Sequence, residues 1–454
     1  MSTTVDPAAL ARLYADHVRA LSARYAEVLG KHGLDALVLH AGSPQKKSAF
    51  DDQSWPLVSV PHTKHWLPLA VVDSAVVIEP GKQPRVLMNV ARDFWEGPPD
   101  EEGDHYWAAL ERVEVQGAEG VRACLPHAAI GAGRAAFVGE DRARAASWGF
   151  VDDKVAPAAV LKDLDALRTI KSAYEIACMR EANRRAALGH AATLRAFVEA
   201  PASELPSELE LHLLYLAATA QDDPETPYKN IVAQDAHAAT LHHVQYRKRR
   251  MSAGSLLVDA GASYCGIESD ITRTVVRTGA RGSGAAADLF GALVAGLDRM
   301  QQELCARVKP GLPYEHLHNQ SHELLAALLR ELGVAKASAA ALVDSGATRK
   351  LLPHGLGHSL GIQTHDVGCR NVAPEARNPF LRNTSTITLG QCFTIEPGCY
   401  FIPALLDELR ALPIAAELDW KAIEALTPFG GVRIEDNLVV REGGHENLTR
   451  PFLS

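Results

Sequence analysis

The stretch VDAGASYCGIESD, residues 258–270, places Asp259 at the end of an apolar run and Asp270 eleven residues later. If the chain folds back around Tyr264 and Cys265, the two aspartates face each other across a hairpin, with Cβ atoms about 4.5–5.5 Å apart. Two ionised carboxylates this close repel, so a shared proton or a metal cation must offset the repulsion. A turn aspartate and an unrelated surface aspartate are the alternative.

Two glutamates also stand where apolar residues are expected. CFTIEPG, residues 392–398, puts Glu396 at the end of an apolar run, and GGVRIEDNLVV, residues 430–440, puts Arg433 and Glu435 on one face of a strand. Carboxylates are almost never fully buried unless they are paired or bind a metal. Four carboxylates in such contexts therefore favour a metal site.

The glycine-rich stretch PHGLGHSLGIQTHDVG, residues 353–368, contains His354, His358 and His365. Glycines separate the first two histidines and no glutamate follows the first, which argues against a helical HExxH zinc site. A loop that presents one histidine as a ligand and the others toward substrate fits better than three unrelated loop residues. Two Asp, two Glu and one His form an oxygen-rich set that suits Mn²⁺ first, with Co²⁺ or Zn²⁺ as alternatives. Two cations about 3.5–4 Å apart could share these carboxylates and hold a bridging hydroxide.

Composition narrows the class of protein. The chain has 454 residues, 22% of them charged, and a net charge of −9, which argues against nucleic-acid and anionic-membrane partners. The basic run 247–250 is interpreted as a solvated loop. No stretch approaches the roughly 18 apolar residues of a membrane span. Seven cysteines without a CxxC pair indicate reduced thiols and a cytoplasmic location.

The order of helix and strand signals predicts two domains, an N-terminal α/β domain over 1–160 and an α+β catalytic domain over 161–454. In the second domain, helices are expected to cover a mostly antiparallel sheet. Periodicity and turn residues predict strands over 36–40, 69–79, 85–89 and 135–139, and helices over 8–30, 172–198, 207–220, 285–308 and 314–332.

These motifs, in this order, resemble the pita-bread metallopeptidases. The match is closest to the bacterial proline dipeptidases and covers nearly the whole chain. It rests on PYKNIVAQDAHAATLHH, DAGASYCGIESDITRT, PHGLGHSLGIQTHDVG, TIEPGCYFIPALL and PFGGVRIEDN, with DDQSWP, KHWLPL and YEIACMREAN toward the N-terminus. The resemblance implies a homodimer that hydrolyses Xaa-Pro dipeptides through a hydroxide bridging two metal ions.

The resemblance also implies a role for each matching residue. The metal ligands would be Asp259, Asp270, His358, Glu396 and Glu435, with Asp270 and Glu435 bridging the two ions. Glu396 would also act as general base and acid, and His365 would stabilise the tetrahedral intermediate. The implied pocket residues are His242, His354, His365 and Tyr228. Arg433 would support the carboxylates or meet the product carboxylate, and Arg382 is the second candidate for gripping that carboxylate.

Residues near the expected pocket depart from the family pattern. His243 stands where relatives usually carry tyrosine, Ile267 where an aromatic residue is expected, and Lys229 where relatives have glycine. These differences leave open the preferred residue before proline. Asp51 or Asp52 could reach the neighbouring subunit's site, and so could Trp66. A surface loop and a packing tryptophan are the alternative.

Three other functions compete with proline dipeptidase. Aminopeptidase P shares the metal site but cleaves longer Xaa-Pro peptides. An organophosphorus acid anhydrolase resembles a prolidase whose pocket also admits phosphotriesters and fluorides. A non-enzymatic binding module on the same fold is disfavoured, because such relatives lose ligand residues and all five are present in this chain.

Overall fold

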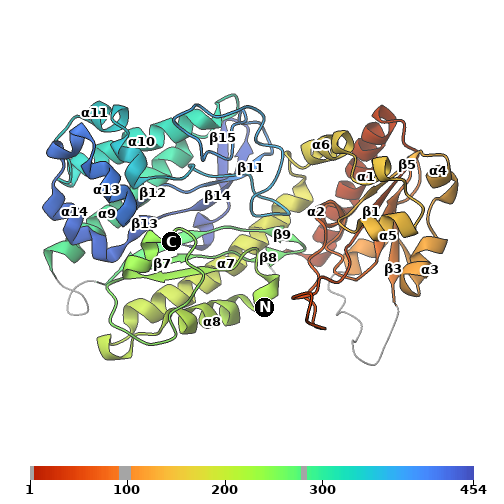
Figure 1. Ribbon diagram of the computed structural model, residues 1–454, viewed down its shortest axis with the longest axis horizontal. Coiled ribbons are helices and arrows are strands. Elements are labelled where there is room, and N and C mark those ends of the chain that lie inside the picture. Colours follow the sequence, from red (N-terminus) through yellow and green to blue (C-terminus); the bar gives the residue numbers. More distant parts are fainter. Residues whose placement is uncertain (1–4, 91–103, 278–283, 454) are drawn as a thin grey trace. The chain divides into compact units, whose positions relative to one another are not determined.

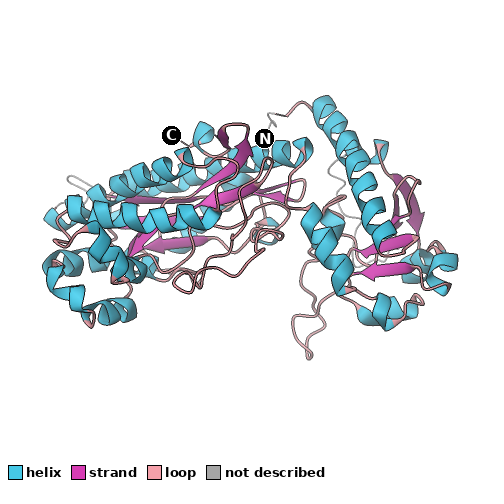
Figure 2. Cartoon of the chain, turned by 90° about the horizontal axis from the view of Figure 1, so that it is seen from above, coloured by secondary structure: helices cyan, strands magenta, loops and turns pink. Residues whose placement is uncertain are grey.

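The computed structural model describes residues 5–90, 104–277 and 284–453. The chain divides into two compact units, Ser2–Cys178 and Met179–Ser454. Figure 2 shows that both units combine helices with strands. The predicted α+β class is confirmed.

The N-terminal unit is built on a five-stranded mixed sheet in the order β4-β3-β2-β1-β5. Side chains from the strands pack with Trp148 and Phe150 into one hydrophobic core. Its strands are β1 (Ala36–His40), β2 (Ala75–Ile78), β3 (Arg85–Asn89), β4 (Glu111–Val115) and β5 (Ala135–Val138). Its helices are α1 (Pro7–Lys31), α2 (Pro61–Lys64), α3 (Gly117–Ala123), α4 (His127–Gly131), α5 (Arg142–Ser147) and α6 (Ala158–Leu167).

The C-terminal unit combines short antiparallel strands with helices (Figure 1). Its strands are β6 (Ile231–Gln234), β7 (Ser255–Asp259), β8 (Ser263–Tyr264), β9 (Ile267–Glu268), β10 (Thr272–Val276), β11 (Cys392–Ile395), β12 (Gly398–Tyr400), β13 (Gly431–Arg433), β14 (Asp436–Arg441) and β15 (Gly444–Asn447). Its helices are α7 (Ala173–Glu199), α8 (Glu208–Thr219), α9 (Ala285–Ala306), α10 (Tyr314–Glu331), α11 (Ala339–Asp344), α12 (Ala347–Leu351), α13 (Pro403–Arg410) and α14 (Trp420–Leu426).

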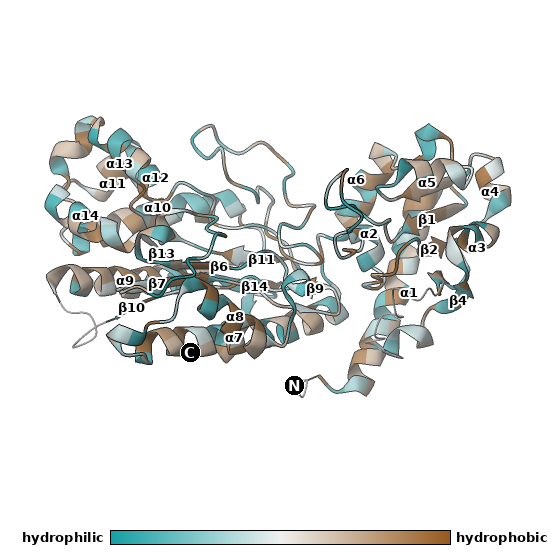
Figure 3. Ribbon diagram, turned by 60° about the horizontal axis from the view of Figure 1, so that its bottom comes forward, coloured by the Kyte–Doolittle hydropathy of each residue, from teal (hydrophilic) through white to brown (hydrophobic). Residues whose placement is uncertain are grey.

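Two groups of strands form the centre of the C-terminal unit. One group has the order β10-β7-β6 and the other β11-β14-β15. They meet at a bridge between Thr272 and Glu435. Apolar side chains of α7 and α8 pack on β6 and β7, and those of α9 and α10 pack on β11 and β14. The helix ribbons alternate between hydrophilic and hydrophobic colours in Figure 3, as expected for helices that bury one face. Helices therefore pack against both groups of strands. The ends of the strands carry the polar residues described below.

The register of the opening hairpin differs from the prediction by two residues. Asp259 pairs with Thr272, the first residue of β10. Asp270 precedes Thr272 by two residues in the chain. The reversal occurs at Cys265 and Gly266, which both have positive φ, and not at the predicted position one residue earlier. Such a two-residue turn matches the right-handed twist of the flanking strands. The two aspartates therefore share one side of the hairpin but are diagonal neighbours.

Most predicted elements agree with the structure to within two residues. The exceptions among the predicted strands are 69–79, of which only Ala75–Ile78 is a strand, and 430–440, which is divided into β13 and β14 with Glu435 between them. Of the described helices, none is long and apolar enough to span a membrane.

Candidate metal centre

Strand ends bring the four predicted carboxylates together in the C-terminal unit. Asp259 ends β7 and Glu396 follows β11, while Asp270 and Glu435 come shortly before β10 and β14. The loop after α12 supplies His358, whose Nε2 lies 3.4 Å from Asp270 Oδ2 and 3.5 Å from Glu396 Oε1. The structure thus places all five predicted ligands around one buried position.

The imidazole of His358 is oriented as a metal ligand requires. Its Nδ1 lies 3.0 Å from the carbonyl oxygen of Ser359, which can only accept, so Nδ1 carries the proton. Its Nε2 faces the carboxylates. Burial lowers the pKa of His358, but the hydrogen bond to Asp270 and the charge of Glu396 outweigh burial and raise it to about 8, so a metal ion would take the place of the Nε2 proton. A backbone carbonyl that fixes the tautomer in this way is typical of metal-bound histidines.

The carboxylates also fit a cation. Among the described residues, Glu435 Oε1 has no hydrogen-bond partner although the residue is 1% exposed. Ligand atoms of Asp270, His358 and Glu435 lie within 4.8 Å of one another. Burial and the neighbouring carboxylates raise the pKa of Glu435 well above its usual value. A divalent cation would remove this cost, because it gives the buried oxygen a partner and offsets the repulsion.

Arg433 and Tyr228 bind the two aspartates directly. Arg433 donates from Nη2 to Asp259 Oδ2 at 2.5 Å and from Nη1 to Tyr400 Oη at 2.8 Å. The hydroxyl of Tyr228 contacts Oδ1 of both Asp259 (2.6 Å) and Asp270. Burial and Asp270 raise the pKa of Asp259, while Arg433 opposes the shift. Arg433 is 4% exposed, so its guanidinium is buried against Asp259 and Tyr400 and not open to solvent.

Glu396 is the predicted ligand nearest the surface and the one closest to His354. Burial raises the pKa of Glu396 to about 7, although the charges of His358 and Arg433 lower it. His354 donates from Nδ1 to the carbonyl of Gly355 at 2.8 Å, so its Nε2 accepts from Tyr400 Oη at 2.9 Å. Both nitrogens of His354 are therefore occupied, and its ring lies in a supporting position 3.8 Å from Glu396 Oε2.

The remaining pocket residues form an exposed rim. His242, His365 and Arg382 are all exposed. Burial and the charge of His358 lower the pKa of His365 to about 4, with further contributions from Arg382 and His242. The ring centroids of His365 and His358 lie 4.5 Å apart. The ring contact places His365 beside the cluster of predicted ligands.

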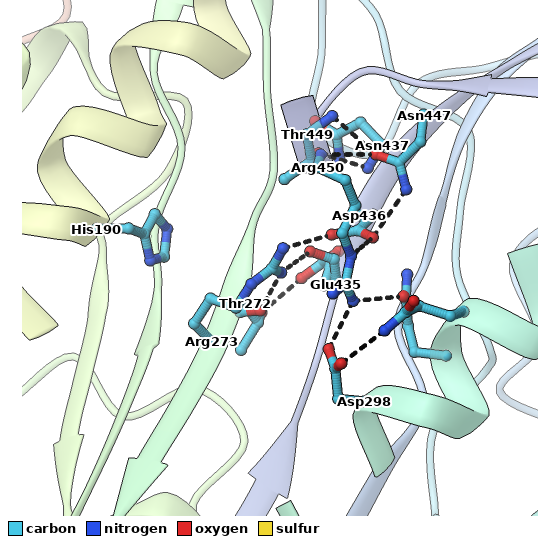
Figure 4. A network of polar contacts seen from close by, with 12 residues as sticks. His190, Thr272, Arg273, Asp298, Glu435, Asp436, Asn437, Asn447, Thr449 and Arg450 are labelled. Carbon is cyan, nitrogen blue, oxygen red and sulfur yellow. Dashed lines mark hydrogen bonds and ion pairs between the residues drawn. The ribbon is translucent and has the colours of Figure 1, made fainter. Parts of the chain in front are cut away.

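Polar residues on neighbouring strands hold the backbone at Asp270 and Glu435, and Figure 4 shows those around Glu435. Asn437 accepts from the backbone N–H of Asp270 at 3.0 Å and donates to its carbonyl oxygen. Asp436 accepts from Arg273 and Arg450, each at 2.7 Å. Arg273 also donates to the backbone oxygen of Glu435 at 2.7 Å. The backbone at Asp270 and at Glu435 is therefore fixed by side chains on neighbouring strands.

The prediction did not include two other supporting residues. Thr272 donates to Glu435 Oε2 at 2.6 Å and accepts from Arg433 Nε at 3.2 Å. Tyr400 connects Arg433 to His354. Both residues lie in buried strands next to predicted site residues. Their polar side chains in these strands were the sequence feature that could have identified them.

Of the three residues expected to depart from the family pattern, two have polar partners of their own and one is buried. Lys229 pairs with Asp223 at 2.7 Å, and Ile267 is 2% exposed. His243 is buried and lies 3.0 Å from Glu208. In the N-terminal unit, Trp66 is 1% exposed, which is the packing role left open above.

Comparisons with known proteins agree with this architecture. Residues 177–442 match the profile of metallopeptidase family M24, and residues 12–165 match the Xaa-Pro dipeptidase N-terminal domain. The Xaa-Pro dipeptidase of Shewanella pealeana is 37% identical, over 97% of this chain and 98% of its own. The Xaa-Pro dipeptidase of Stenotrophomonas maltophilia is also 37% identical, over 99% of this chain and 98% of its own.

Solved structures share the fold at lower identity. Proline aminopeptidase P II from Yersinia pestis superposes with a TM-score of 0.70 at 20% identity, covering 98% of this chain and 97% of that one. E. coli aminopeptidase P with the inhibitor Pro-Leu gives a TM-score of 0.70 at 20% identity, covering 97% and 96%.

Proposed function

Because the chain belongs to metallopeptidase family M24, we propose that it is an Xaa-Pro dipeptidase, which hydrolyses dipeptides with a C-terminal proline. The observation that carries the proposal is the convergence of four carboxylates and the His358 Nε2 on one buried position. Relatives named Xaa-Pro dipeptidase, 37% identical over nearly the whole chain, support the choice of substrate.

The proposed ligands are Asp259, Asp270, His358, Glu396 and Glu435, with Asp270 and Glu435 shared between two divalent cations. When bound, such cations polarise the scissile carbonyl and supply a hydroxide at neutral pH. Mn²⁺ is the proposed metal, because the donor set is rich in carboxylate oxygen and has one imidazole.

The chain's own residues would then handle the protons and the developing charge. Glu396 would accept the proton of the attacking water and deliver it to the prolyl nitrogen, which has no hydrogen of its own in the peptide. His365 would donate to the oxyanion, and His242 would contact the substrate. Tyr228 would line the pocket and orient the two aspartates. His354 would act on the reaction indirectly, by holding Tyr400 and through it Arg433, because both of its ring nitrogens are occupied.

Arg382 is the proposed reader of the substrate's free carboxylate. Arg433 is buried on Asp259 and Tyr400, so its donors are committed to the interior. Arg382 is exposed, and its charge contributes to the lowered pKa of His365, which places it near the reacting centre. A guanidinium fork there would bind a proline carboxylate and disfavour a longer chain.

The proposed function is tested with protein that has been chelated and reloaded with Mn²⁺. Ala-Pro and Ala-Pro-Ala are offered separately, and released alanine is measured. We expect turnover of the dipeptide only, and its loss after chelation. Equal or faster turnover of the tripeptide would instead identify an aminopeptidase P activity.

Replacing Arg382 with alanine is expected to lower kcat/KM for Ala-Pro by about 100-fold, because a charge-assisted bidentate contact of up to about 3 kcal/mol is lost. R382K should recover part of this loss, since lysine keeps the charge but not the fork. R370A is the matched control, because Arg370 is an exposed arginine on the same loop. Unchanged discrimination between dipeptide and tripeptide in R382A would remove Arg382 from the proposal.

We also propose that the protein is a cytoplasmic homodimer. All seven cysteines are thiols and not disulfide partners, which suits a reducing compartment. Phe50, Trp55 and Val58 are exposed apolar residues close together in the sequence of the N-terminal unit, and clusters of this kind are typical of interaction surfaces. Asp51 and Asp52 lie between them and would be carried to that interface. Light scattering after size exclusion should report a dimer mass.

A further inference from the structure

Glu208 is a buried carboxylate outside the metal cluster. It opens α8, is 0% exposed, and accepts four hydrogen bonds. Oε1 accepts from the Gln234 backbone N–H at 2.9 Å and His237 Nδ1 at 2.6 Å. Oε2 accepts from His243 Nε2 at 3.0 Å and the Arg247 backbone N–H at 2.7 Å. All four donors belong to the segment 234–247, so one side chain ties this whole segment to α8.

The protons on the two histidines follow from their partners. Arg247 donates from its guanidinium to His237 Nε2 at 3.2 Å, so His237 carries its proton on Nδ1 and donates it to Glu208. The rings of His237 and His243 lie 4.3 Å apart, centroid to centroid. These three side chains are close enough together for a cation, but a metal on His237 would have to displace that proton. The arrangement is therefore a hydrogen-bonded anchor.

The anchor persists over the working pH range. Burial disfavours the charged carboxylate, but the hydrogen bonds from His243, the two backbone N–H groups and His237 outweigh it and lower the pKa of Glu208 to about 2. An ionised acceptor makes these hydrogen bonds stronger than neutral ones.

The segment carries His242 between the anchor and the pocket. His243 is buried and points to Glu208, while its neighbour His242 is exposed. Because neighbouring side chains leave the backbone in different directions, the exposed ring of His242 is directed away from the buried contact between His243 and Glu208. The hydrogen bond from His243 to Glu208 fixes the backbone at residues 242 and 243. It therefore also fixes the direction in which the His242 side chain leaves the backbone.

We propose that Glu208 is a positioning residue, which holds the segment 234–247 through His237 and His243 so that His242 faces the substrate. The role of His242 rests on the proposed dipeptidase function, whereas the anchoring of the segment does not. The two parts can therefore be tested separately.

The anchoring is tested by hydrogen exchange on the full chain without substrate. E208Q keeps the size of the side chain but turns an amide group toward donors that need an acceptor. We expect faster exchange over residues 235–247 and unchanged exchange over α9 and α10. E204Q is the matched control, because Glu204 is exposed and lies just before α8. If E208Q does not fold, H243L serves, since it removes one of the four hydrogen bonds. Unchanged exchange over 235–247 would overturn the proposal.

The link to His242 is tested by kinetics on Ala-Pro. E208Q should raise KM about 10- to 100-fold, with a smaller effect on kcat, because a displacement of about 1 Å at a substrate contact can cost this much. In the H242A background the same E208Q change should have little further effect. H243Q, whose amide can replace the Nε2 donor, should retain more activity than H243L.

The outcomes separate the two proposals. Additive effects of E208Q and H242A in an active dipeptidase would overturn the positioning role and leave the dipeptidase function intact. A wild-type protein without dipeptidase activity would overturn the proposed function and with it the role of His242. The exchange experiment would then decide the anchoring of the segment by itself.

Discussion

Replacing Asp270 with asparagine is expected to lower kcat/KM for Ala-Pro by at least about 10³-fold, which corresponds to roughly 4 kcal/mol of transition-state stabilisation. The substitution removes an anionic oxygen that faces His358 and is proposed to be shared by both cations. The fold should be retained, because Asn437 binds the backbone of residue 270 and not its side chain. Activity and calorimetric Mn²⁺ binding are measured on the same preparations.

Thermal unfolding gives a second, activity-independent readout for D270N. A cation that binds only the folded state raises the stability by about 2.7 kcal/mol at a concentration 100 times its Kd. We expect Mn²⁺ to raise the Tm of the wild type and to raise that of D270N far less. D223N is the control, because Asp223 is a partly exposed aspartate paired with Lys229 outside the cluster. A normal metal-induced shift in D270N would remove this residue from the ligand set.

Glu396→Gln is expected to lower kcat by about 10²–10⁴-fold, the range that general acid–base groups supply. Glutamine keeps the shape of the side chain but cannot accept and return a proton. Glu396 Oε1 lies 3.5 Å from His358 Nε2, which places the carboxylate where it could receive a proton from a water held at the cluster. Rates at saturating substrate and Mn²⁺ separate this loss from weaker metal binding.

The matched control for E396Q is E424Q, because Glu424 forms an exposed ion pair with Arg410 in the same unit. E396D tests the distance requirement, since aspartate keeps the charge but withdraws it by one methylene. Activity of E396Q close to wild type at saturating Mn²⁺ would show that another group transfers the proton.

The sequence was most informative where a polar residue interrupts an apolar run. The strand 36–40 follows from a short, mostly apolar run whose five residues are all buried, and the helix 314–331 follows from apolar residues at helical spacing. The carboxylates at positions 259, 270, 396 and 435 stood out for the complementary reason, since charge in such runs needs a partner. All four lie in the cluster.

The features that sequence reasoning missed depend on contacts between distant segments. Nothing in the run SELE indicates that Glu208 accepts hydrogen bonds from residues 26 to 39 positions later. The same holds for Asn437, whose partner Asp270 is 167 residues away. The hairpin register was wrong because apolar alternation cannot distinguish two registers that differ by two residues, which place the same side chains on the same face.

That two-residue difference sets the gap between the first two carboxylates. Side chains directly opposite in an antiparallel pair are about 4.5–5.5 Å apart at Cβ, whereas diagonal ones are about 7–8 Å apart. Asp259 pairs with Thr272, so Asp270 takes the diagonal position. The hydroxyl of Tyr228 contacts Oδ1 of both aspartates across this diagonal. A reversal one residue earlier, at Tyr264 and Cys265, would bring the two carboxylates directly opposite each other, so the position of the turn at Cys265 and Gly266 sets the spacing of the first two carboxylates of the cluster.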